Sequence, residues 1–160
     1  MLSTKRVSSH LSTWFETAKG ADEPWAGSFI RADFSQDQHP ILFKDFEVKK
    51  AVSQARIYVL GLGEYELYLN GKKVGDEYLL PGLHSYDCWL QYQTFELNPE
   101  NGENRLEVLL GEGWYKGQYG LKRRLPRYGT EYALRAEVHL CYADGTVEVF
   151  GTDLSWKAKK

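Results

Sequence analysis

Glu64-Tyr65-Glu66-Leu67-Tyr68-Leu69-Asn70-Gly71-Lys72-Lys73-Val74 is the stretch that decides the fold of this 160-residue chain. Side chains alternate between the two faces of a strand, so Tyr65, Leu67 and Leu69 point to one face and the residues between them point to the other. Asn70-Gly71 is the strongest dipeptide signal for a type I′ turn, because both central positions of that turn need positive φ. The stretch therefore predicts an antiparallel hairpin with one packed face and one solvated face.

Short extended runs continue on both sides of this hairpin. Residues 57–60 are apolar on both faces, which is typical of a strand covered on both sides and placed centrally in a sheet. Asp144-Gly145 marks a second hairpin turn. We expect extended segments over residues 41–48, 55–60, 64–70, 72–78, 91–97, 106–110, 132–142 and 146–150. Turn signals at this regular spacing predict an all-β fold, either a sandwich or a barrel.

Composition and charge limit the classes to which the chain can belong. The length fits one domain, and 42% hydrophobic residues supply enough apolar mass for a core. A formal net charge of -2 provides no basic field for nucleic acid, and no apolar run is long enough to span a bilayer. Cys88 and Cys141 are too few for a disulfide framework and are expected to be free thiols. We expect neither nucleic acid nor a membrane as partner, and the absence of a signal-peptide pattern favours a cytoplasmic location.

The motifs that mark common enzyme classes are missing from the sequence. A nucleophile elbow, a Walker loop and an HExxH motif do not occur. Gly61-Leu62-Gly63 lacks the third glycine of a dinucleotide fingerprint and precedes a strand, so we interpret it as a backbone bend. Glycosidases need two facing carboxyl groups, whereas Glu64 and Glu66 fit a solvated strand face, and the four histidines lack the spacing of metal ligands. We therefore expect no catalytic residue, no metal and no cofactor.

The longest stretch without a strand pattern, residues 111–130, is rich in aromatic and basic side chains. Trp114, Tyr115 and Tyr119 lie there, and Tyr86 and Trp89 can join them from a neighbouring loop. Flat aromatic faces with polar groups around them suit the C–H surface and the hydroxyls of a sugar ring. Two other interpretations stay open. In the first, Trp114 and Tyr115 cap the core of the sandwich, as the usual burial of Trp favours. In the second, the loop contacts another domain of a longer protein.

Several further motifs occur in a fixed order along the chain. They are Gly63–Asp76, Leu80-Pro81-Gly82, Tyr86-Asp87, Gln91–Thr94, Gly102-Glu103-Asn104 and Gly111–Gly117, followed by Asp144-Gly145 and Thr152–Lys157. Each motif is weak alone, but the set is specific. In order and spacing it resembles the amino-terminal β-sandwich domain of bacterial α-L-rhamnosidases, of the glycoside hydrolase family 78 type. The resemblance covers residues 25–160 and implies an antiparallel β-sandwich of the galactose-binding, jelly-roll kind.

The resemblance implies an accessory role for this chain. In that family the parent enzyme hydrolyses terminal α-L-rhamnosides with inversion, using an acid and a base carboxylate on an (α/α)6 barrel downstream of the sandwich. The chain ends before such a barrel, so we expect the barrel of the parent chain as a partner and no catalytic residue here. Two rival hypotheses are a rhamnose-binding module, which takes rhamnose-containing glycans around Trp114, Tyr115 and Tyr119, and a self-contained hydrolase.

The resemblance also bears on the N-terminal segment and on calcium. Residues 1–24 are expected to form an extended segment or linker, and residues 25–160 the sandwich. Leu11 to Ala18 follow helical spacing, but the resemblance implies an extended path there, which we prefer. Some related sandwiches bind rhamnose through calcium with an Asp-Asn pair where this chain has Gly61-Leu62-Gly63-Glu64. That departure argues against calcium-dependent sugar binding.

Overall fold

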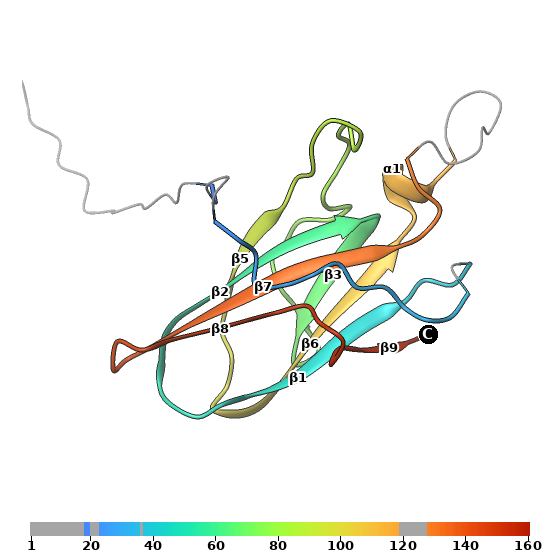
Figure 1. Ribbon diagram of the computed structural model, residues 1–160. Coiled ribbons are helices and arrows are strands. Elements are labelled where there is room, and N and C mark those ends of the chain that lie inside the picture. Colours follow the sequence, from blue (N-terminus) through green and yellow to red (C-terminus); the bar gives the residue numbers. More distant parts are fainter. Residues whose placement is uncertain (1–17, 20–22, 36, 119–127) are drawn as a thin grey trace, which may run out of the picture.

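Two packed antiparallel sheets make up the computed structural model, which describes residues 18–19, 23–35, 37–118 and 128–160 (Figure 1). The elements are β1 (Ile41–Val48), β2 (Val52–Leu62), β3 (Glu64–Leu69), β4 (Lys72–Lys73), β5 (Gln93–Leu97), β6 (Gly102–Gly111), α1 (Gly113–Lys116), β7 (Ala133–Tyr142), β8 (Val147–Gly151) and β9 (Lys157–Lys159). The strands are ordered β4-β3-β6-β1-β9 in one sheet and β5-β2-β7-β8 in the other. The predicted antiparallel β-sandwich is confirmed. The helical spacing of residues 11–18 falls, except for its last residue, outside the described residues.

The hairpin predicted over residues 64–74 forms at the expected turn. Tyr65, Leu67 and Leu69 are buried, and the residues between them are half-buried. Asn70 and Gly71 have φ values of 52° and 75°, both positive, as a type I′ turn requires. The sequence predicts the second strand of this hairpin over residues 72–78, and that length is wrong. Only β4 pairs with β3 before the chain turns at Gly75, where φ is 76°.

The core lies between the two sheets. β2 is central in its sheet, flanked by β5 and β7, as its doubly apolar pattern predicts. Ile57, Val59, Leu106, Val108 and Leu134 are fully buried. Full burial of each such side chain contributes about 1.5–3 kcal/mol, which gives the domain a core of its own. Among the described residues, no helix is long and apolar enough to cross a membrane.

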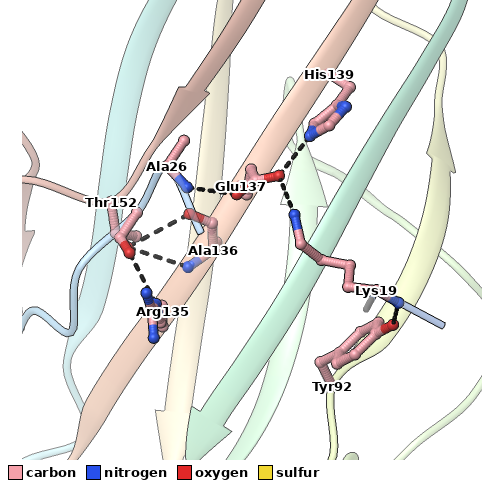
Figure 2. A network of polar contacts seen from close by, with 9 residues as sticks. Lys19, Ala26, Tyr92, Arg135, Ala136, Glu137, His139 and Thr152 are labelled. Carbon is pink, nitrogen blue, oxygen red and sulfur yellow. Dashed lines mark hydrogen bonds and ion pairs between the residues drawn. The ribbon is translucent and has the colours of Figure 1, made fainter. Parts of the chain in front are cut away.

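A buried ionic network holds the N-terminal segment on the outer face of the β5-β2-β7-β8 sheet (Figure 2). Glu137, on β7, is 2% exposed and accepts hydrogen bonds from the Lys19 ammonium at 2.6 Å and from the Ala26 backbone N–H at 2.5 Å. Its carboxylate also contacts Nε2 of His139. The Lys19 backbone N–H donates to the Tyr92 hydroxyl at 2.7 Å. Alternation along β7 assigns Glu137 to a polar face, and the segment around Ala26 covers that face.

Candidate functional site

Two loops connect strands here: one runs from β4 to β5, and the other contains α1 and leads from β6 to β7. The first loop and α1 lie at the same end of the sandwich (Figure 1). Six large apolar side chains in these loops, which we call the apolar end, are between 38% and 70% exposed: Tyr78, Leu79, Leu83, Trp89, Leu90 and Trp114. Exposed apolar side chains favour contact with a partner, because water otherwise covers them at a cost in free energy.

An aromatic cluster joins the two loops beneath this surface. The ring of Tyr86 lies 5.0 Å from that of Tyr115 and 5.1 Å from that of Tyr128, measured between ring centroids. The His84 ring lies 3.8 Å from Tyr86 and 5.1 Å from Trp89. The structure therefore brings together three of the five residues singled out in the sequence: Tyr86, Trp89 and Tyr115. Trp114 precedes Tyr115 on α1, and Tyr119 lies outside the described residues.

His84 is the member of this cluster that the sequence does not reveal. It is 6% exposed, and neither ring nitrogen has a hydrogen-bond partner of good geometry in the described part of the chain. Burial lowers the pKa of the imidazole, and the backbone of Gly82 opposes that effect in part. Histidine spacing gives no signal for this position, because the rings beside His84 belong to Tyr86 and Trp89, and Tyr86 in turn packs against the second loop.

The lowered pKa gives a direct prediction for His84. We expect it to titrate below the ordinary 6.5, because burial disfavours the imidazolium. Protonation is then more favourable in the unfolded chain, so His84 should reduce stability as the pH falls below 6.5. Proton NMR titration of the ring C–H signals measures this pKa, and His84→Phe identifies the signal by its loss. A value at or above 6.5 would contradict the prediction.

A pocket of about 280 Å³ lies beside the apolar end. Leu79 and Leu109 contribute apolar groups to its wall, and Glu64 contributes a carboxyl. Burial raises the pKa of Glu64, which is half-buried. A Cβ atom at position 113 would clash with Cγ of Glu64, so Gly113 leaves the room that this side chain occupies. The presence of glycine at position 113 of the Gly111–Gly117 motif is thus explained by the space that the Glu64 side chain needs.

Grouped metal ligands are not found among the described residues, where no three His, Cys, Asp or Glu side chains lie close enough together to hold a metal ion. Glu66, the other acid of the pocket, is already engaged by the Tyr68 hydroxyl at 2.5 Å and by the Lys73 ammonium at 3.7 Å. This end of the sandwich thus presents exposed apolar groups and, at the pocket, the carboxyl of Glu64.

The two sheets and the loops that connect them define an antiparallel β-sandwich domain with exposed apolar side chains in two of its loops. The chain belongs to the family described as the α-L-rhamnosidase N-terminal domain, whose model matches residues 50–160. The predicted family is confirmed. An α-L-rhamnosidase of Streptomyces avermitilis is 40% identical over 111 residues, which are 68% of this chain and 11% of the relative.

Solved structures agree with this assignment. The structure of the Streptomyces avermitilis α-L-rhamnosidase complexed with L-rhamnose matches with a TM-score of 0.69 and 37% identity, over 76% of this chain and 12% of that one. The Aspergillus terreus α-L-rhamnosidase matches with a TM-score of 0.73 and 31% identity, over 87% of this chain and 16% of that one. The chain therefore spans a small part of the length of the relatives that it matches.

Proposed function

We propose that the chain is a non-catalytic accessory domain of an α-L-rhamnosidase, and that its apolar end packs against the catalytic portion of the same parent enzyme. The observation that carries this proposal is the exposure of six large apolar side chains in two loops that meet through the rings of Tyr86 and Tyr115. Burying apolar surface contributes about 25 cal/mol per Å². Relatives of which this chain spans only 11–16% have ample surface to cover it.

The packing can be tested by removing apolar side chains in the parent enzyme. The double substitution Leu83→Ser and Trp89→Ser should shorten the half-life of rhamnosidase activity at elevated temperature about 10-fold, equivalent to about 1.4 kcal/mol, because the interface loses two anchors. Leu154→Ser is the matched control, since Leu154 is fully exposed but lies between β8 and β9. Equal half-lives for the double variant and the control would contradict the proposal.

The non-catalytic role has its own test. The chain alone should not hydrolyse a chromogenic α-L-rhamnoside above the rate of buffer, because the proposal places both carboxylates of the reaction elsewhere in the parent enzyme. Saturable turnover that co-purifies with the chain would assign it the reaction and contradict the accessory role.

A rhamnose-binding module is the second candidate, and His84 favours it. A buried ring without a good hydrogen-bond partner, next to the half-exposed indole of Trp89, offers a polar group and a flat apolar face, as sugar sites do. Calorimetric titration of the chain with L-rhamnose, with and without calcium, separates the two candidates. Saturable binding that is lost in Trp89→Ala selects the module, and no heat of binding selects the accessory domain.

A further inference from the structure

Glu64 is the one acid of its pocket for which the described residues provide neither a hydrogen bond nor an ion pair. Glu66 is engaged by Tyr68 and Lys73. The Tyr65 hydroxyl donates to Gln93 at 2.7 Å, and Nδ1 of His39, also on the pocket wall, lies 3.3 Å from the Tyr132 hydroxyl. A half-buried carboxylate without a partner costs free energy, in agreement with the raised pKa of Glu64.

The surroundings of Glu64 indicate which kind of side chain could pair with its carboxylate. The carboxyl is held at the edge of the sheet by pairing of Glu64 with Gly111, and the N-terminal glycine of α1 packs against it. Leu79 and Leu109 supply an apolar wall next to the charge. Lysine and arginine combine an apolar stem with a cationic head, so such a side chain matches both parts of the pocket at once.

We propose that this pocket receives an arginine or lysine side chain from the catalytic portion of the parent enzyme, whose cationic head pairs with Glu64 and whose stem lies against the leucines. The inference rests on the proposed packing of the apolar end. Leu79 belongs to both surfaces, so the pocket is continuous with the apolar end. A charge-assisted pair at the edge of an apolar contact fixes orientation, because a misplaced partner would leave Glu64 unpaired.

Glu64→Gln should act in opposite directions in the parent enzyme and in the isolated chain. In the parent it removes the ion pair, so the half-life of activity at elevated temperature should fall about 10-fold. In the isolated chain it replaces an unpaired carboxylate with a neutral amide, so the midpoint of thermal unfolding at pH 7 should stay the same or rise. Glu47→Gln is the matched control, because Glu47 lies on β1 of the same sheet but outside the pocket, and its ion pair with Lys49 is exposed. It should leave the half-life of the parent close to that of the wild type.

The outcomes distinguish this inference from the packing on which it rests. If Leu83→Ser with Trp89→Ser shortens the half-life and Glu64→Gln does not, the packing stands and the inference is wrong. If neither shortens it, both are wrong. If Glu64→Gln lowers the unfolding midpoint of the isolated chain, Glu64 has a structural role and the inference fails. Sedimentation of the isolated chain tests a second copy as occupant, because a dimer that Glu64→Gln dissociates would overturn the assignment to the catalytic portion.

Discussion

Glu137→Gln should lower the free energy of unfolding by about 3 kcal/mol, because it removes the charge from a buried pair and leaves Lys19 without its counter-ion. The Lys19 side chain is 11% exposed and the Glu137 side chain 2%, so water compensates little for either. Urea unfolding followed by circular dichroism measures the loss. Glu131→Gln is the control, since its partner Arg31 and Glu131 itself are both more than half exposed. A change below about 0.5 kcal/mol is expected there.

The same variant should also change how stability depends on pH. Burial raises the pKa of Glu137, but hydrogen bonds from Lys19, His139 and Ala26 outweigh it and hold the pKa below the ordinary 4.5. A carboxyl whose pKa is lower in the folded state contributes stability above the unfolded value and loses it as the pH falls through the folded value. The gap between wild type and Glu137→Gln should therefore be full at pH 7 and shrink below pH 4.5. A constant gap down to pH 3 would show that the Glu137 charge is not the source of the difference.

Local patterns predict the hairpin of β3 and β4 because everything that forms it lies within ten residues. Alternation assigns the faces of β3, and Asn70-Gly71 supplies the two positive φ values. The length of β4 is less predictable, because it depends on how many residues the edge of the sheet can pair before Gly75 turns the chain. The residues of a turn therefore predict where two strands begin to pair, but they do not predict where the pairing ends.

The burial of Glu137 and of His84 could not be predicted, because residues distant in the sequence contribute to it. Glu137 looks like a surface residue on β7, but Ala26 and Lys19, 111 and 118 residues away, bury it. His84 is enclosed in the same way, because Tyr86 beside it packs against Tyr115 and Tyr128 of the second loop. The contact of Tyr86 with Tyr115 is easier to predict, because the order of the strands already brings their two loops to the same end of the sandwich. The burial of a particular polar side chain depends on where a distant segment of the chain passes over it. A local sequence pattern holds no information about that path.

The end of the sandwich that carries the Glu64 pocket depends on one glycine. Gly63 has a φ of 123°, and a Cβ atom there would lie 2.5 Å from the carbonyl oxygen of Gly111 in β6. Gly111 is the residue that pairs with Glu64. Because the obstructing atom belongs to the backbone, relief requires a shift of the paired strands rather than of a flexible side chain. Such a shift would move both Glu64 and the start of α1.

Gly63→Ala should therefore lower the free energy of unfolding by about 3 kcal/mol, the sum of backbone strain and overpacking. Gly145→Ala is the matched control, because Gly145 also has positive φ, at 82°, but a Cβ atom added there would meet no other atom within 4 Å. It should cost about 1 kcal/mol, from backbone strain alone. Urea unfolding of the two variants measures the difference. Equal losses would show that the close approach to Gly111 contributes nothing, and the geometry of the Glu64 pocket would then not depend on Gly63.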